Sequence, residues 1–399
     1  MNGKETNGKG NARKQILTAL LATVPTFTYG VQIGWLSPMG KLLKSDSSPA
    51  PAPLTDSDIS WMATSLLWAG ICGIPFASYA SDRFGRRICI IGVSVLSCIS
   101  WLIKLTTPRP IPLVVARVFA GLAAGGCFVV VPVYIKEIAE DSLRGALASL
   151  TMTVCKLGVI FVYAVGMTCS YSVNQWVYLS VASAHVVLFF FMPESPNFLL
   201  KIGKEQGARK AISWLRSLPS DHKVVTNEVN KLKAERRRFQ DLPPVTLLSV
   251  VRDRPTASAL RTTLILMAIQ TLSGCFALIN YAADVFNRVG TAWDPNLLAL
   301  LMGALQLAGS FFTTMSIEKF GRKPPLAISS LVVCICMATL ATCFLLQSGA
   351  EEVAATAAGA AQNVTSMGAA NITMENITNA KIDFGITDIS TMRAIAESN

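Results

Sequence analysis

The chain has 399 residues, of which 52% are hydrophobic and only 15% charged, and its mean hydropathy is +0.47. Soluble globular proteins carry roughly 25% charged residues, so this composition excludes an ordinary soluble domain and indicates a protein embedded in a lipid bilayer. The formal net charge of +11 could suggest a nucleic-acid partner. The positive residues gather instead in alternate loops, which is typical of cytoplasmic loops in membrane proteins, so we expect no nucleic-acid partner.

Nine apolar segments are each long enough to cross about 30 Å of hydrocarbon as a helix. A lipid-facing segment must satisfy its own backbone hydrogen bonds, so all nine are predicted to be helices and the fold class to be an all-α, polytopic transmembrane bundle. The segments are 16–36, 59–80, 88–105, 111–135, 146–168, 176–192, 262–283, 297–317 and 326–346.

Charge and sequon positions give the expected orientation. With the N-terminus in the cytoplasm, the predicted cytoplasmic loops hold 26 of the 35 Lys and Arg residues and the outer segments hold seven, while Arg117 and Lys156 lie within spans. An odd number of spans places residues 348–399 outside the cell. Asn-X-Thr sequons occur only there, at Asn363, Asn371 and Asn376. We therefore expect a multi-pass plasma-membrane protein with a cytoplasmic N-terminus and a glycosylated extracellular tail.

Four regions are predicted along the chain. A six-span bundle over 1–192 is followed by a basic cytoplasmic loop over 193–259, in which 203–217 and 224–239 have the apolar spacing of short amphipathic helices. Three further spans lie within 260–347. The tail, 348–399, is rich in Ala, Thr, Asn and Gly and is expected to be disordered.

A charged hexapeptide is written twice between apolar segments, as Asp-Arg-Phe-Gly-Arg-Arg at 82–87 and as Glu-Lys-Phe-Gly-Arg-Lys at 318–323. Such a copy indicates internal duplication, which is common in transporters. The ten cysteines lie in or at the ends of spans and are interpreted as packing residues, so no metal site or other cofactor is predicted. The sequence has no recognisable nucleotide-binding loop and no nucleophile–base constellation, so we do not expect an enzyme. The oligomeric state stays open.

Several motifs accompany the hexapeptides: Gly30 to Pro38 in the first span, Arg117 with Gly121 and Gly125 in the fourth, 132–137 leading to Arg144-Gly145, Pro193-Glu194-Ser195-Pro196, and Gln270 to Gly274 in the seventh. Together they resemble the sugar porter family of the major facilitator superfamily, and the start of the first span resembles its insect facilitated trehalose transporter branch. The resemblance covers residues 16–347. It implies twelve spans, the last three of which this chain lacks.

Glycines four residues apart, as at Gly30 and Gly34 or Gly121 and Gly125, are predicted to let helices approach closely. The charged residues at the expected cytoplasmic turns are predicted to form a network that closes an inner gate, and the resemblance implies the same role. Glu137 and Arg144, seven residues apart, could share one helical face. The full set is Asp82, Arg86, Arg87, Glu137, Arg144, Glu318, Arg322 and Lys323.

A sugar site needs polar groups that converge from several helices. The resemblance places sugar ligands at Gln270 and Gln306. Where the family has amides, this chain has Met152, Thr271 and Phe276, each of which removes a group that both donates and accepts. Where proton-driven members carry an acid, this chain has Gln32, which cannot carry a proton.

The leading hypothesis is facilitated transport, without proton coupling, of trehalose or a hexose by alternating access. The lost amides and missing helices predict little or no saturable uptake of these sugars by residues 1–399 alone. Two alternatives stay open: a truncated or diverged non-transporting relative with a regulatory or binding role, and a transporter of another polar solute.

Overall fold

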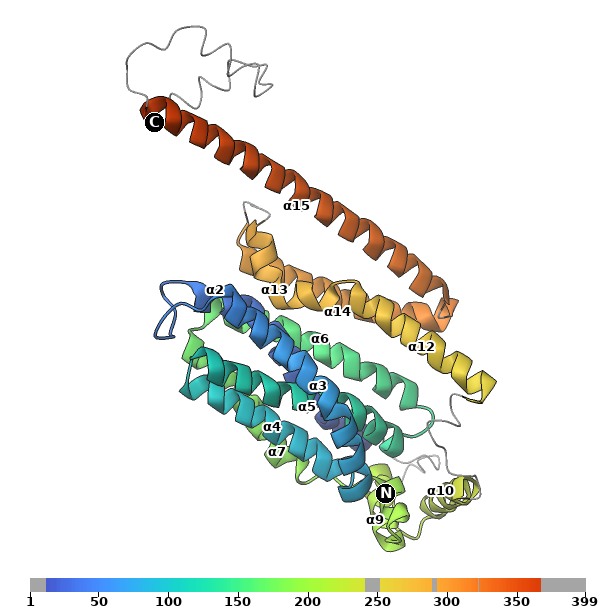
Figure 1. The fold of residues 1–399 in the computed structure, drawn as a ribbon. Helices are drawn as coiled ribbons and strands as arrows, with labels where there is room; N and C mark the ends of the chain where they lie inside the picture. The colour runs from blue at the N-terminus through green and yellow to red at the C-terminus, as the bar shows by residue number, and fades with distance from the viewer. Residues whose placement is uncertain (1–11, 241–251, 289–292, 322, 367–399) are drawn as a thin grey trace, which may run out of the picture. The chain divides into compact units, whose positions relative to one another are not determined.

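The computed structural model describes residues 12–240, 252–288, 293–321 and 323–366. All regular secondary structure in these residues is helical, as predicted. The first seven helices form a bundle (Figure 1). They are α1 (Arg13–Gly34), α2 (Leu36–Lys44), α3 (Asp56–Phe84), α4 (Arg86–Thr106), α5 (Pro110–Ile138), α6 (Arg144–Thr168) and α7 (Tyr171–Phe189).

Local chemistry accounts for several helix boundaries. Thr55 and Asp58 form a capping box at the start of α3, in which each side chain accepts a hydrogen bond from the other residue's backbone N–H. Pro110 begins α5, where its missing N–H costs nothing. Pro38 cannot donate to the carbonyl of Gly34, four residues earlier, and its ring crowds that carbonyl. This explains why α1 ends at Gly34 and α2 begins after Trp35.

Two close helix crossings hold this bundle together, and both use the predicted glycines. A Cβ built on Gly30 of α1 would lie 2.1 Å from the carbonyl oxygen of Cys155 in α6. One built on Gly121 of α5 would lie 2.2 Å from the carbonyl oxygen of Leu66 in α3. No side chain larger than hydrogen fits at such distances, so the prediction of close backbone approach at these glycines is confirmed.

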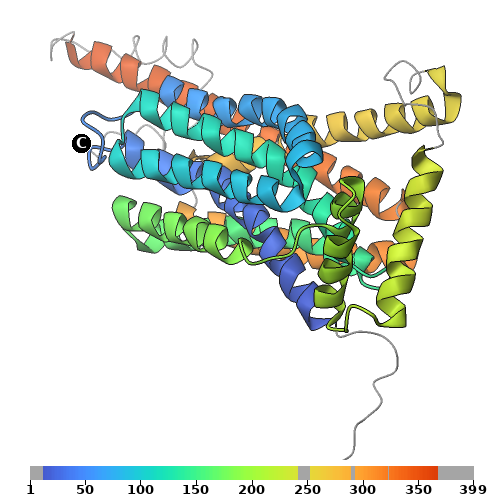
Figure 2. The same ribbon diagram turned by 90° about the horizontal axis from the view of Figure 1, so that it is seen from below.

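Three short helices follow α7 and gather at one end of the bundle (Figures 1 and 2). They are α8 (Pro196–Lys201), α9 (Glu205–Arg216) and α10 (Lys223–Gln240), and α9 and α10 match the two amphipathic helices expected from the sequence. Arg216 fixes them to the bundle, because it pairs with Glu228 of α10 at 2.5 Å and donates to the carbonyl of Ile138 at 3.2 Å.

The remaining described helices are α12 (Arg254–Leu272), α13 (Cys275–Arg288), α14 (Pro295–Phe320) and α15 (Lys323–Ser366). The predicted seventh span is thus two helices, broken at Ser273 and Gly274, where Gly274 has a φ of 76°. α14 packs against α6, and α13 packs against α2 and α14. Residues from Cys334 onward form a second unit, of which the described part is α15 from Cys334 to Ser366.

Two features differ from the prediction. Eight segments of the described residues, not nine, are long and apolar enough to cross a membrane. The predicted span 176–192 falls on α7, whose polar residues, among them Asn174, Gln175 and His185, lower its hydropathy. In addition, α15 continues to Ser366, about twenty residues beyond the expected end of the last span, because the Ala-rich stretch favours helix. Asn363 therefore lies in a helix, while Asn371 and Asn376 lie outside the described residues.

Candidate functional site

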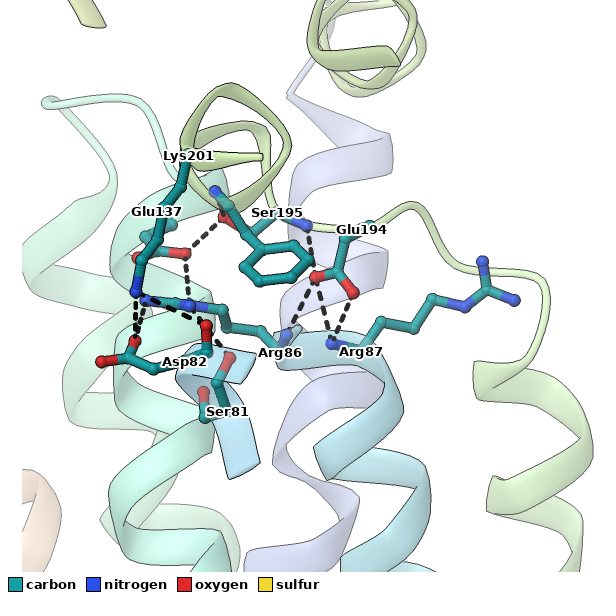
Figure 3. A network of polar contacts seen from close by, with 9 residues as sticks. Ser81, Asp82, Arg86, Arg87, Glu137, Glu194, Ser195 and Lys201 are labelled. Atoms are coloured by element: carbon teal, nitrogen blue, oxygen red, sulfur yellow. Dashed lines mark hydrogen bonds and ion pairs between the residues drawn. The ribbon is translucent and has the colours of Figure 1, made fainter. Parts of the chain in front are cut away.

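A network of charged side chains lies at the end of the bundle next to α8, and Arg86 is at its centre (Figure 3). Its guanidinium pairs through Nε with Glu137 Oε2 at 3.2 Å and through Nη2 with Asp82 Oδ1 at 3.2 Å. Lys201 of α8 approaches the same Asp82 oxygen at 3.3 Å, and the Ser195 hydroxyl donates to Glu137. The network therefore ties together α3, α4, α5 and the segment that leads into α8.

Glu194 holds the start of α4 from the other side. Its carboxylate accepts hydrogen bonds from the backbone N–H groups of Arg86 at 3.0 Å and of Arg87 at 3.1 Å, so a negative charge sits at the positive end of the helix. Gly85, with a φ of 103°, makes room for it, since a Cβ there would lie 2.4 Å from Glu194 Oε2. Burial raises the pKa of the Glu194 carboxyl above its usual value, and these N–H donors oppose that shift.

Some predicted members of the network lie elsewhere. The Arg87 guanidinium donates to the carbonyl of Phe190 at 2.5 Å. Arg144 pairs with Asp141 at 2.8 Å instead of with Glu137, so the expected Glu137–Arg144 relation is wrong. The reason is that α5 ends at Ile138 and the chain turns before α6 begins at Arg144, so the two residues do not share one helix.

The second copy of the hexapeptide has no described network. Lys323 is exposed at the start of α15, whereas Arg322 and the side chain of Glu318 lie outside what the structure describes. The proposed gating role therefore concerns the first copy.

Gln32 lies in a second polar cluster, completely inside the bundle. Its Oε1 accepts from Lys104 Nζ at 2.5 Å, its Nε2 donates to Ser100 Oγ at 3.2 Å, and its backbone carbonyl accepts from Arg117 Nη1 at 2.5 Å. Lys104 and Arg117 are each 0% exposed. Among the described residues neither cation has an ion pair with a carboxylate.

Two tryptophans complete this cluster. The Lys104 ammonium lies 4.0 Å from the ring centroid of Trp101 and 4.3 Å from that of Trp35, distances at which a cation is attracted to the ring face. The charge of Lys104 is thus compensated by an amide and two aromatic rings.

A polar seam joins the bundle to α14. Lys156 Nζ of α6 donates to Gln306 Oε1 at 3.0 Å, and the hydroxyls of Thr153 and Ser310 lie 3.3 Å apart. We call these four residues the α6–α14 seam. Toward the end where α2 lies, the backbone N–H of Ala283 donates to Ser37 Oγ at 3.0 Å and the Tyr163 hydroxyl donates to the carbonyl of Ile279 at 2.8 Å. That end is closed by direct contact between α2, α6 and α13.

Among the five predicted sugar-site positions, Gln306 has a described side-chain hydrogen bond to another helix, through Lys156. Gln270 and Thr271 are exposed on α12, and the Thr271 hydroxyl donates to the carbonyl of Met267 within its own helix. Met152 is 54% exposed on α6. Phe276 is half-buried and packs against the apolar core. The described residues therefore do not show these five side chains converging on one sugar-sized site.

Sequence reasoning missed several participants, among them Lys201, Glu194, Ser195 and Lys104. Glu194 and Ser195 stood in a motif that supported the resemblance but were not assigned to the network, although an acid directly after a span is a natural partner for a basic turn. Lys104 was counted with the outer segments, although it falls inside the predicted span 88–105. A buried charge in a span is expensive, and that alone would have singled it out.

These features define a helical membrane protein of the transporter type, and comparisons with known proteins agree. The family described as "Sugar (and other) transporter" matches residues 17–374, so the chain belongs to this family. The chain is 27% identical over 342 residues to the facilitated trehalose transporter Tret1 of Aedes aegypti, covering 85% of this chain and 42% of that protein. It is also 27% identical over 342 residues to Tret1 of Culex quinquefasciatus, with 85% and 65% covered.

The chain thus spans about two fifths to two thirds of the length of these relatives. Among solved structures, the partially occluded inward-open xylose transporter XylE from E. coli matches with a TM-score of 0.63 and 22% identity, covering 77% of this chain and 74% of that one. XylE bound to 6-bromo-6-deoxy-D-glucose matches with a TM-score of 0.62 and 21% identity, with 79% and 71% covered. At these identities the likeness shows that the fold is that of the major facilitator superfamily.

Proposed function

We propose that the protein carries out facilitated transport of a sugar or a sugar-like polar solute by alternating access, without proton coupling. The observation that carries this proposal is the α6–α14 seam, where Lys156–Gln306 and Thr153–Ser310 join the two sets of helices by polar side chains. Polar groups at membrane depth are costly and usually mark a solute pathway. The family and the trehalose transporters it includes make trehalose or a hexose the first solutes to test.

Alternating access needs one closed end and one end that can open. Contacts among α2, α6 and α13 close one end, and the Arg86 network with Glu137 and Asp82 lies at the other. We infer that the network is the gate. Both Arg86 and Glu137 are mostly buried, at 11% and 12% exposed side chain, so opening would have to separate or move a desolvated pair.

Two features support the proposed absence of proton coupling: the amide of Gln32 and the basic side chains beside it. An amide cannot cycle a proton, and its oxygen is already bound by Lys104 at 2.5 Å. The neighbouring positive charges of Lys104 and Arg117 would repel an incoming proton. Collapse of the proton gradient should therefore leave the rate of transport unchanged.

The test is counterflow of radiolabelled trehalose and glucose in proteoliposomes that contain either residues 1–399 or a form extended by three further spans, with empty liposomes as the control. Saturable counterflow by the extended form that persists with a protonophore supports the proposal, whereas residues 1–399 alone should give little or none. Counterflow by the extended form equal to that of empty liposomes contradicts transport of these sugars, and loss of counterflow with protonophore contradicts the uncoupled mechanism.

We also infer a cytoplasmic N-terminus, because 26 of 35 Lys and Arg fall in the predicted loops on one side. An extracellular tail requires that α7, at 19 residues, crosses the membrane as a ninth span. We propose the plasma membrane as the location. Glycosidase treatment of microsomes should shift the mobility of the chain, and joint replacement of Asn363, Asn371 and Asn376 should abolish the shift. A tail that is cut by protease only from the cytosolic side would contradict this orientation.

A further inference from the structure

Lys156 lies near the middle of α6 and faces α14. It follows the start of the helix at Arg144 by twelve residues, which at about 1.5 Å per residue is a rise of about 18 Å in a hydrocarbon layer about 30 Å thick. Its ammonium is half-buried and donates to Gln306 Oε1 at 3.0 Å. A cation at this depth is costly unless a partner or a function compensates it.

The described surroundings of Lys156 offer it no carboxylate. In α1–α7 and α12–α14 the acidic residues all lie close to helix ends, at Asp56, Asp58, Asp82, Glu137, Asp284 and Glu318. An amide satisfies only one of the three donors of an ammonium group. Lys156 therefore keeps most of its capacity to bind an anion.

Two further basic residues, Lys104 and Arg117, lie inside the same bundle. Both are completely buried in the same bundle, and both are held by Gln32 without an ion pair to a described carboxylate. Charges in a low-dielectric interior act over longer distances than charges in water, so they favour a negative solute and oppose a cation.

The side chains beside Lys156 match this preference. Met152 lies four residues earlier and hence on the same face of α6, where it offers a sugar hydroxyl no donor and only a weak sulfur acceptor. Thr153, Ser310 and Gln306 supply two hydroxyls and an amide within the seam. The seam thus combines one cation with neutral polar groups, which suits a solute that carries one anionic group and several hydroxyls.

We propose that the solute is an anionic sugar, bearing a carboxylate or a phosphate, and that Lys156 recognises the anionic group. This inference rests on the proposed transport function and names the solute class. The anion would replace Gln306 as the partner of Lys156, and a charge-assisted hydrogen bond is roughly twice as strong as a neutral one. Gln306, once released, can bind a sugar hydroxyl. A neutral sugar gives Lys156 no better partner than Gln306 already does.

The test compares binding of glucose, glucuronate and glucose 6-phosphate to the purified full chain by titration calorimetry at fixed ionic strength. We expect at least one anionic sugar to bind about tenfold or more tightly than glucose. Lys156→Gln should abolish that preference, and Lys156→Arg should retain it. Lys223→Gln removes the same charge from exposed α10 and should leave the preference intact. Glucuronate and glucose 6-phosphate, compared with each other, distinguish a carboxylate solute from a phosphate solute.

Glucose binding as tight as that of both anions would overturn the inference while leaving sugar transport standing. A preference that survives in Lys156→Gln, or that is lost equally in Lys223→Gln, would overturn the role of Lys156. Binding of none of the three sugars would overturn both the inference and the proposed function. Elution volume and melting temperature of each variant, measured beside Lys156→Arg, separate loss of binding from loss of fold.

Discussion

Gly125 of α5 allows the sharpest test of how the bundle is packed. A Cβ at this position would lie 2.2 Å from the carbonyl oxygen of Gly70, 2.9 Å from the backbone nitrogen of Ile74 and 3.1 Å from the carbonyl carbon of Gly73. All three atoms belong to the backbone of α3, so no side chain can rotate away. Gly125→Ala must therefore push α3 and α5 apart along their crossing.

The magnitude follows from the geometry and from a matched control. Overpacking of this kind costs about 1–3 kcal/mol or more. Gly92→Ala in α4 makes the same chemical change where no atom lies within 4 Å of the new Cβ. Replacing a mid-helix glycine by alanine in open space gains about 0.5–1 kcal/mol. The two variants should thus differ by about 1.5–4 kcal/mol.

The assay is the apparent melting temperature of detergent-solubilised protein, followed by loss of the monodisperse peak on size exclusion after heating. Gly125→Ala should melt several degrees below the parent chain, and Gly92→Ala at or slightly above it. Gly121→Ala, whose Cβ would meet the carbonyl oxygen of Leu66 at 2.2 Å, should behave like Gly125→Ala. A Gly125→Ala variant as stable as Gly92→Ala would refute the close crossing of α3 and α5.

Three further outcomes follow from the charged groups. Glu137→Lys removes the mostly buried acceptor of Arg86 and Ser195, so we expect it to destabilise that end of the bundle and to speed maleimide labelling of half-buried Cys89. Lys223→Glu should change neither stability nor labelling, and equal labelling of Cys89 in both variants would count against a gate. The hydrogen bond from Lys231 and the charge of Arg144 lower the pKa of the Asp141 carboxyl. The folded protein therefore gains the full stabilisation from Asp141 when the pH is above the usual Asp pKa of about 3.9, and loses it as the pH falls through the lowered pKa. Amide exchange in α10, corrected for intrinsic rates, should rise only below about pH 4 in the parent chain but already at pH 7 in Asp141→Asn, and acid-insensitive exchange would contradict this. Gln32→Asp should leave any uptake insensitive to protonophore, because a carboxylate in contact with Lys104 would stay ionised. A proton-dependent Gln32→Asp variant would refute that electrostatic reading.

The sequence by itself determined the helices and the class of protein. Hydropathy and length predicted the apolar spans, because a segment in lipid must satisfy its own backbone and can do so only as a helix. The glycine spacing predicted the close crossings at Gly30 and Gly121, since a missing side chain acts locally wherever the helix meets its neighbour. Short motifs likewise indicated the family. Hydropathy, glycine spacing and motifs are properties of residues close together in the sequence, so they do not depend on how the helices pack.

Only the tertiary structure decided which polar groups meet. Arg86 and Glu194 are more than a hundred residues apart in the chain, and Lys156 and Gln306 are 150 apart. Whether such residues touch depends on how each helix is rotated about its axis and where the chain turns between helices, which no local pattern specifies. Because the chain turns after Ile138, Arg144 pairs with Asp141, and Glu137 pairs with Arg86. Lys104 is buried in the interior, where it donates to Gln32. Successive residues of an α-helix are rotated by about 100°, so a shift of one residue turns a buried side chain toward the lipid. The sequence therefore identified candidate residues, and the packing of the helices determined which of them form contacts.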